Sequence, residues 1–409
     1  MKITFLNLGK QPIANNFLPK ESLEKKEYFF DLEVVFNTKN NLVSLKKFVE
    51  PEKMFNDQYV YHSSQSSTMR NHFRNISNLL KNEFKPNKVV EIGSNDGVFS
   101  FNFDQEKTFC VEPCGNFAKI TSNKNYKTYN NFWNYKISNK IKTNHGLIDL
   151  VYSANCMCHI QDLNDAFSSI YNLLSEEGIF VFEDPSLLKM ISRNSFDQIY
   201  DEHAHIFSVL SIKKLLEQNN LDLFRVESLN THGGSNRIFA CKKDTRKIEE
   251  SVTLFLKEEI DAGLDKIEIF QNFAKRVEKN KKDLVEILRK FKLQNKKIVS
   301  YGATSKSTTV FNYCEINDNL IEYITDTTIA KQGKFSPGVH IPVYSDKMFD
   351  KTVDVAFLGA WNFKKEIFEK EKDFLARGGV FITHIPEVKV INQEEIRNYV
   401  DIKTNRSKI

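Results

Sequence analysis

The segment Tyr200–His205, which reads YDEHAH, places five titratable side chains within six consecutive positions. Imidazole, carboxyl and phenol groups can each donate or accept a proton during catalysis. Histidine is of particular interest because the ordinary pKa of its imidazole lies near neutral pH. The spacing indicates proton-transfer chemistry, and on residue types alone an acid/base role, a metal site and a structural role all remain open.

A second segment, Val89–Ser100, reads VVEIGSNDGVFS and predicts a buried strand followed by a glycine-punctuated turn. Glycines at positions 93 and 97 allow a tight turn and a close approach by a ligand, because neither carries a Cβ. The G-x-G-x-x-G spacing typical of dinucleotide sites is absent, which disfavours a nicotinamide cofactor. Glu112 ends the next predicted strand, where its carboxylate can accept hydrogen bonds from two ribose hydroxyls.

Together these features favour S-adenosylmethionine as the cofactor. Asn95 and Asp96 are expected at its methionine end, where an amide and a carboxylate can hold ammonium and carboxylate groups. The candidate cofactor-binding residues of this turn are Glu91, Gly93, Asn95, Asp96, Gly97 and Glu112.

The elements that must position these residues follow from the hydrophobic pattern. Short alternating segments at Tyr28–Val35 and Leu42–Phe48 predict a small β-containing module, and Met69–Leu80 has helical spacing. Apolar runs then alternate with helical patterns, which predicts a mostly parallel sheet with both faces covered. Its strands are expected at 89–92, 108–111, 148–153, 178–182, 221–226 and 237–241.

Residues 248–293 carry apolar positions at helical spacing among many charges and predict one or two long amphipathic helices. A second alternation begins at Lys297, with a GATSKS turn, Gly302–Ser307, after its first strand. Its strands are expected at 298–301, 322–325, 353–358 and 380–383. Two Rossmann-like domains account for this pattern.

Composition narrows the function further. The chain has 58 basic and 53 acidic side chains, a net charge of +5, and no segment in which basic and aromatic residues interleave along a phosphate backbone. None of its six cysteines forms a C-x-x-C pair, and no run of about 18 apolar residues or signal-peptide pattern is present. A cytoplasmic protein, a monomer or homodimer that binds neither nucleic acid nor membrane, is therefore expected.

Several motifs along nearly the whole chain resemble the S-adenosylmethionine-dependent C-methyltransferases that act on nucleotide-linked 4-keto deoxysugars. They are LGKQPIANNFL (8–18), YVYHSSQSSTMRNHF (59–73), EIGSNDG, VEP, SANCMCHIQDL (153–163), YDEHAHIFS, HGGSNR (232–237), YGATSKS and KQGKFSPGVHIPV (331–343). The resemblance implies an α/β fold in which a class I methyltransferase Rossmann-like domain lies between a small β-containing module and a C-terminal Rossmann-like domain. The expected boundaries are 1–68 for the module, 69–245 for the methyltransferase domain, 246–295 for a helical connector and 296–409 for a substrate-binding domain.

The resemblance also implies a reaction. Members remove the proton from a carbon beside a ketone and pass the sulfonium methyl to the resulting enolate. Matched to the family motifs, His203 is the expected base and Glu202 is expected to orient it or share the proton transfer. Tyr200 and Tyr61 are expected to hydrogen-bond the sugar or the developing oxyanion, and His159 to contact substrate or enolate.

Further residues are assigned by the same motifs. Asn155 joins the cofactor-binding candidates, whereas His205 is as compatible with a structural role as any single histidine. The substrate-binding candidates are Tyr59, His232, Gly233, Arg237, Thr304 and Lys306, although the turns that carry His232 and Thr304 also suit a purely structural role. Lys306 and the backbone amides of its turn are expected near the nucleotide diphosphate.

The chain departs from the family in its N-terminal module. Family members usually carry four cysteines there for a structural zinc, but the second pair falls near Phe36 and Lys39, and the first pair has no counterpart. Zinc in this module is predicted to be absent, with apolar packing in its place. Two other functions fit the same residues: a sugar O-methyltransferase, and a catalytically silent sugar-nucleotide-binding subunit.

Overall fold

The computed structural model describes residues 1–395, so the last part of the expected C-terminal domain, 396–409, lies outside the described residues. Contacts divide the chain into two compact units. The first comprises Met1–Phe5, Val34–Lys189 and Glu202–Phe270, and the second comprises Leu6–Glu33, Met190–Asp201 and the chain from Gln271 onward. Each unit is therefore assembled from segments that are far apart in sequence, and the four-part division by sequence remains a prediction.

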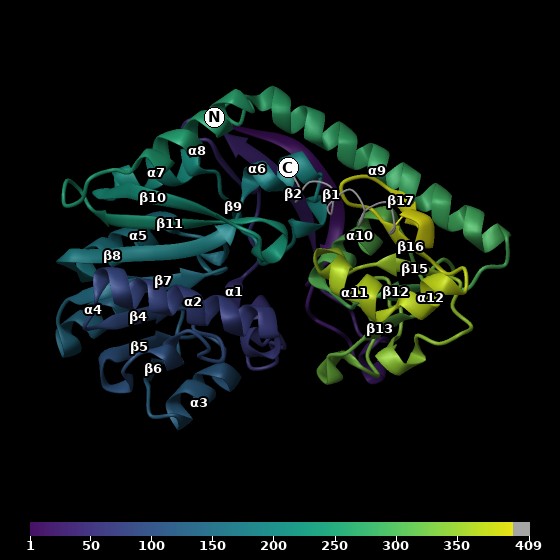
Figure 1. Ribbon diagram of the computed structural model, residues 1–409, viewed down its shortest axis with the longest axis horizontal. Helices are drawn as coiled ribbons and strands as arrows, with labels where there is room; N and C mark the ends of the chain where they lie inside the picture. The colour runs from purple at the N-terminus through teal and green to yellow at the C-terminus, as the bar shows by residue number, and fades with distance from the viewer. Residues whose placement is uncertain (396–409) are drawn as a thin grey trace, which may run out of the picture. The chain divides into compact units, whose positions relative to one another are not determined.

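The first unit is built on a seven-stranded sheet in the order β10-β11-β8-β7-β4-β5-β6 (Figure 1). The strands β4 to β8 are parallel, whereas β11 runs antiparallel to both β8 and β10. Their bounds are β4 Val89–Ile92, β5 Thr108–Val111, β6 Lys127–Tyr129, β7 Ile148–Ala154, β8 Leu174–Pro185, β10 Leu221–Leu229 and β11 Ser235–Lys242. The strand β4 pairs with β5 on one side and with β7 on the other, which makes β4 the switch point of the chain order. In open α/β sheets, ligands bind at the carboxyl ends of the strands at such a point.

Helices cover both faces of this sheet, as the alternating pattern requires. The face that buries Val89, Leu150 and Val181 packs against α2, Ser67–Phe84, whose Met69, Phe73, Ile76 and Leu80 form its apolar stripe. Ser66 caps this helix by accepting a hydrogen bond from Met69 N at 3.3 Å. The opposite face packs against α4 Tyr135–His145, α5 Leu163–Leu173 and α7 Val209–Gln218. The remaining helices of this unit are α1 Pro51–Met54, α3 Gly115–Asn123 and α8 Glu250–Asp261.

The N-terminal part of the chain forms a four-stranded sheet in the order β1-β2-β3-β9. The strands are β1 Lys2–Pro12, β2 Phe29–Asn37, β3 Leu42–Leu45 and β9 His205–Ile206. Phe36, which lies where the family carries a zinc-binding cysteine, is 1% exposed and packs on Phe270 with ring centroids 4.6 Å apart. An apolar contact therefore occupies this position.

The second unit contains a six-stranded sheet in the order β14-β13-β12-β15-β16-β17, parallel except for β17. Its strands are β12 Ile298–Tyr301, β13 Ile324–Asp326, β14 Val343–Ser345, β15 Val355–Leu358, β16 Val380–Thr383 and β17 Lys389–Ile391. Its helices are α10 Ser305–Cys314, α11 Lys364–Lys370 and α12 Lys372–Ala376. Two helices cross the boundary between the units: α6, Leu187–Arg193, and α9, Ile267–Leu293, the long green helix of Figure 1.

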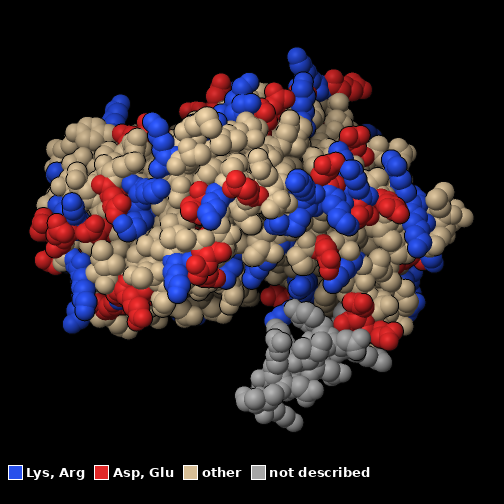
Figure 2. All heavy atoms as spheres, turned by 90° about the horizontal axis from the view of Figure 1, so that it is seen from above, with Lys and Arg blue, Asp and Glu red and all other residues tan. Residues whose placement is uncertain are grey.

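These bounds confirm the α/β prediction and its two alternations of strands and helices. No helix within residues 1–395 is both long enough and apolar enough to cross a membrane. On the face displayed in Figure 2, acidic and basic side chains are interspersed.

Candidate active site

The turn after β4 has the backbone conformation that its glycines were expected to allow. Gly93 and Gly97 have φ of +71° and +80°, and Asn95 also adopts a left-handed conformation with φ of +47°. A Cβ on Gly97 would lie 2.5 Å from Phe101 Cζ, so this position has no room for a side chain. Glu112, at the end of β5, accepts hydrogen bonds from Asn95 N at 2.7 Å and Cys114 N at 2.9 Å. The carboxylate thereby fixes the turn at the sheet's switch point.

Two buried oxygen atoms at this turn fit a ligand. Asp96 is 5% exposed, and its Oδ2 accepts a hydrogen bond from Ser64 N at 3.1 Å, while its Oδ1 and Ser94 Oγ are buried without a hydrogen-bond partner. Buried polar atoms are nearly always paired, so these two call for a donor from outside the chain. Each oxygen of Glu112 keeps acceptor capacity beyond its one N–H donor. The turn therefore suits the ammonium and ribose groups of S-adenosylmethionine.

Glu91 and Asn155, the two other cofactor-binding candidates, form hydrogen bonds with groups of the chain itself. Glu91 Oε2 accepts hydrogen bonds from Ser100 N, at 3.1 Å, and from Ser100 Oγ, and burial raises the pKa of Glu91 to about 8. Asn155 has a positive φ of +49° and donates its N–H to the Glu183 carbonyl at 2.6 Å. Both are held by partners within the chain, and their contact with the cofactor remains a prediction.

The segment 57–65 lies against the turn through several hydrogen bonds. Asn95 accepts one from Ser63 N at 3.0 Å and donates one to the Tyr61 carbonyl at 2.9 Å. Tyr61 itself is 43% exposed. The same segment carries Tyr59, whose hydroxyl donates to Glu202 Oε2 at 3.0 Å. It therefore connects the cofactor turn with the proton-transfer segment.

Four expected residues of the first unit meet in one cluster, in which Glu202 and His203 are buried and Tyr59 and His159 are half-buried. Glu202 and His203 are 3% and 8% exposed, in the loop before β9, and Tyr59 contacts Glu202 as described. The rings of His159 and His203 lie 5.5 Å apart between centroids, with 18° between their planes. His159 comes from the short helix Met157–His159 that follows β7. Burial lowers the pKa of His159 to about 3, so its imidazole is neutral at physiological pH.

The other histidine of the segment has a different setting. His205 is 4% exposed on β9, which pairs with β3, and its Nε2 lies 3.3 Å from the Gln161 carbonyl. Burial lowers the pKa of His205 to about 4. These contacts support a structural role. Tyr200 belongs to the second unit, two residues before Glu202 in the chain, and its catalytic role remains a prediction.

The HGGSNR motif lies at the start of β11. His232 and Gly233 both have positive φ, +52° and +89°, in a tight turn before the strand. Arg237 is 7% exposed and donates from Nε to Glu183 Oε1 at 2.8 Å and from Nη1 to Glu227 Oε2 at 2.7 Å. Burial opposes the charged form of Arg237, yet attraction to Glu183 raises the pKa of the guanidinium. These ion pairs hold the guanidinium within the sheet.

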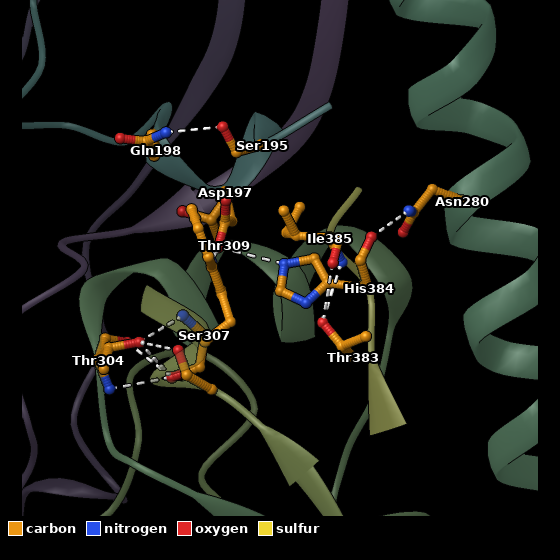
Figure 3. A network of polar contacts seen from close by, with 12 residues as sticks. Ser195, Asp197, Gln198, Asn280, Thr304, Ser307, Thr309, Thr383, His384 and Ile385 are labelled. Atoms are coloured by element: carbon orange, nitrogen blue, oxygen red, sulfur yellow. Dashed lines mark hydrogen bonds and ion pairs between the residues drawn. The ribbon is translucent and has the colours of Figure 1, made fainter. Parts of the chain in front are cut away.

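In the second unit, the GATSKS turn has internal partners. Thr304 caps α10, since its Oγ1 accepts from Ser307 N at 3.0 Å (Figure 3). Its hydroxyl also donates to the Gly359 carbonyl at 3.1 Å. Lys306 Nζ lies 4.8 Å from the centroid of the Trp361 ring. Burial lowers the pKa of Lys306, against the attraction of the Asp197 carboxylate.

Asp197 has 0% exposure and is joined to His384 in Figure 3. Its Oδ2 accepts a hydrogen bond from Trp361 Nε1 at 2.6 Å and lies 3.1 Å from His384 Nε2. Burial acts to raise the pKa of Asp197, but His384 and Lys306 hold it below its ordinary value. Substrate binding by Thr304 and Lys306 remains a prediction, because both already have these partners.

Sequence reasoning missed three contributors to the first unit's site. Cys158 Sγ lies within 4.8 Å of the ligand atoms of both His159 and His203. Phe55 packs on His159 with ring centroids 5.2 Å apart. His72 Nε2 lies 2.6 Å from Glu183 Oε2, opposite Arg237. Only Cys158 had a signal in the sequence, namely its position directly before His159.

Three family models match successive parts of the chain. Their descriptions are a putative zinc binding domain over residues 1–55, a methyltransferase domain over 64–226 and a C-methyltransferase C-terminal domain over 230–386. The chain is 32% identical over 396 residues to the C-methyltransferase NovU of Streptomyces niveus, which covers 95% of this chain and 94% of that protein.

Solved structures show weaker likenesses. A magnesium protoporphyrin IX methyltransferase from Synechocystis with bound S-adenosylhomocysteine has a TM-score of 0.34 and 11% identity, covering 42% of this chain and 83% of that one. A possible histamine N-methyltransferase from Thermotoga maritima has a TM-score of 0.33 and 18% identity, covering 43% and 92%. Scores this low carry no argument about function.

Proposed function

The chain belongs to the family of S-adenosylmethionine-dependent C-methyltransferases, and from this premise we propose that its substrate is a nucleotide-linked 4-keto deoxysugar. The observation that supports the proposal most is the link between a buried acid/base cluster and the cofactor turn. Tyr59 contacts Glu202, and Ser63 contacts Asn95. The backbones of Tyr59 and Ser63 are at most about 14 Å apart, which supports the proposal that one substrate and its methyl donor contact both groups.

The chemistry requires a base that works at neutral pH, and His203 is the residue we assign to that step. A neutral imidazole accepts the proton from the carbon beside the ketone, and the electron pair moves onto the carbonyl oxygen to give an enolate. The cofactor supplies an electrophilic methyl group when bound. With the cofactor bound, the enolate carbon would form a C–C bond to that methyl as the S–C bond breaks, S-adenosylhomocysteine would leave, and the proton would remain on His203.

Neighbouring side chains are assigned supporting roles. Glu202 accepts a hydrogen bond from the Tyr59 hydroxyl, and we propose that it orients His203 or shares its proton. Neutral His159 and the tyrosines at 61 and 200 are proposed to donate hydrogen bonds to the sugar or to the enolate oxygen, whereas Tyr59, which donates its hydroxyl proton to Glu202, is proposed to contact the sugar as an acceptor. Exclusion of water by the buried cluster strengthens each of these interactions.

The assignment of the base is tested by proton exchange without methyl transfer. The protein is incubated in heavy water with a nucleotide-linked 4-keto-6-deoxyhexose and S-adenosylhomocysteine, and deuterium at the carbon beside the ketone is followed by NMR. His203→Gln is expected to slow exchange by about 10²–10⁴-fold, the usual size of a general-base effect. His205→Gln, at the neighbouring structural histidine, is the matched control and is expected to exchange at the parent's rate.

The position of the methyl group tests the reaction itself. With labelled S-adenosylmethionine we expect a carbon-bound methyl in the product, and an oxygen-bound methyl would contradict the proposal. Exchange at the parent's rate in both His203→Gln and Glu202→Gln would remove the base assignment while leaving the family membership intact.

A further inference from the structure

Three side chains of the proton-transfer cluster are of the types that bind transition metals. The ligand atoms of Cys158, His159 and His203 all lie within 4.8 Å of one another. Within residues 1–395, no other group of three such side chains comes as close. We infer that these residues form a binding site for a thiophilic divalent cation such as Zn²⁺, and that an ion bound there inhibits the methyltransferase.

The distance between the two imidazole rings is close to that expected for two ligands of one ion. Zn²⁺ binds nitrogen at about 2.0–2.1 Å in tetrahedral geometry, which places two ligating rings roughly 5 Å apart between centroids. The rings of His159 and His203 are 5.5 Å apart with an 18° angle between their planes. Tetrahedral ligand atoms are separated by about 3.3–3.8 Å, so closure onto an ion requires shifts of roughly 1 Å, within the reach of side-chain rotation.

A soft cation bound here has to displace the proton of the Cys158 thiol, because burial and the Asp184 carboxylate raise the pKa of this thiol well above its ordinary value. Cys158 is 2% exposed, and His159 Nε2 is buried without a hydrogen-bond partner, a state that a metal ion would relieve. A sulfur and two imidazole nitrogens select Zn²⁺ over Mg²⁺ or Ca²⁺, which prefer oxygen ligands. The backbone N–H of Cys158 donates to Asp184 Oδ2 at 3.2 Å, which fixes the short helix that carries both Cys158 and His159.

The N-terminal module offers no thiolate or imidazole ligand that could compete with this cluster for zinc. Residues 1–55 match a family described as a putative zinc binding domain, yet this stretch contains no cysteine and no histidine. A titration of the whole chain with a thiophilic metal therefore reports on the central cluster without competition from thiolate or imidazole ligands in that module.

Occupancy has a chemical consequence that rests on the proposed function. An ion held by His203 takes the lone pair with which the imidazole would accept the substrate's proton. Zn²⁺ at this site is then expected to inhibit both proton exchange and methyl transfer, and chelation is expected to restore them.

Binding is measured first, with no substrate present. The metal-free full chain is titrated with Co²⁺, whose thiolate charge-transfer absorption reports a sulfur ligand, and with Zn²⁺ by calorimetry. Loss of a partner in the outer shell of a metal site costs about 10–100-fold in affinity, so Cys158→Ser and His159→Gln are expected to weaken binding at least that much. Cys156→Ser, in the same loop but outside the group, is the matched control and is expected to bind as the parent does.

The outcomes separate this inference from the proposed function. One ion per chain with a thiolate band that Cys158→Ser abolishes supports the site. Absence of the band, or unchanged affinity in the folded Cys158→Ser and His159→Gln chains, overturns it, whatever the activity. A Zn²⁺-loaded chain that still exchanges the substrate proton at the full rate overturns the inhibitory role and counts against His203 as the base.

Discussion

The buried Arg237 guanidinium gives a quantitative test between structural and substrate-binding roles. It donates to Glu183, which is 2% exposed on β8, and to the more open Glu227. Removing one member of a buried ion pair typically costs about 3–5 kcal/mol, because the remaining charge loses its partner. Glu183 retains His72 at 2.6 Å, so we expect Arg237→Met to lower the free energy of unfolding by about 3 kcal/mol, the lower end of that range.

The effect should depend on pH in a defined direction. Burial acts to raise the pKa of Glu183, but His72 and Arg237 together hold it below its ordinary value. A depressed carboxyl pKa contributes stability above the pKa of the unfolded chain, about 4.3, and this stability is lost as pH falls through the folded value. The difference between parent and Arg237→Met should therefore be constant at neutral pH and shrink below about pH 4.

The assay is urea unfolding of the full chain, followed by near-ultraviolet circular dichroism with and without S-adenosylhomocysteine. Glu227→Gln removes the more exposed partner of the same arginine and is expected to cost less than about 1 kcal/mol. If Arg237→Met unfolds within about 1 kcal/mol of the parent while the KM for the sugar nucleotide rises sharply, the reasoning from the ion pair is refuted. Arg237 would then be a substrate ligand.

Three further changes test other parts of the site. Gly97→Ala places a Cβ against Phe101 at a positive φ, so we expect a loss of about 1–3 kcal/mol and weaker S-adenosylhomocysteine binding by calorimetry; parent-like affinity would contradict this. Tyr59→Phe removes the hydrogen bond to Glu202 and should lower kcat about tenfold, roughly 1.4 kcal/mol, with an unchanged circular dichroism spectrum; an unchanged kcat would exclude a role for this bond. Asp197→Asn should lower the urea midpoint by the equivalent of about 1–3 kcal/mol without altering S-adenosylhomocysteine affinity, and an unshifted midpoint would argue against the network in Figure 3.

Local sequence signals predicted much of the fold. The expected strands 89–92 and 108–111 coincide with β4 and β5, because each is a short, mainly apolar segment whose four residues are all buried. The helical pattern over 248–293 resolves into α8 and α9. By contrast, β1 and β6 were not predicted, since β6 spans only three residues and β1 alternates buried and exposed positions irregularly.

The contacts of the candidate site residues were harder to predict from the sequence, because their partners lie far away along the chain. Lys306 was assigned to a diphosphate from its turn, yet it neighbours Asp197, more than one hundred positions earlier in the chain. Arg237 was assigned to substrate from its motif, but its partner Glu183 is set by the antiparallel pairing of β11 with β8. Charge and motif identify such residues, whereas the strand register decides which partner each one meets.

The interleaving of the two units has a consequence for biosynthesis. Within the second unit, Thr308 Oγ1 donates to the Ala14 carbonyl at 3.0 Å, and His340 Nε2 lies 2.9 Å from Glu27 Oε2. These contacts close loops of about three hundred residues, so the segment Leu6–Glu33 leaves the ribosome long before its partners are made. Contacts of such high sequence separation form late and slow folding. Expression of the chain cut near residue 245 would separate both Leu6–Glu33 and Met190–Asp201 from the rest of the second unit, so division of this protein into fragments has to follow its contacts and not its sequence order.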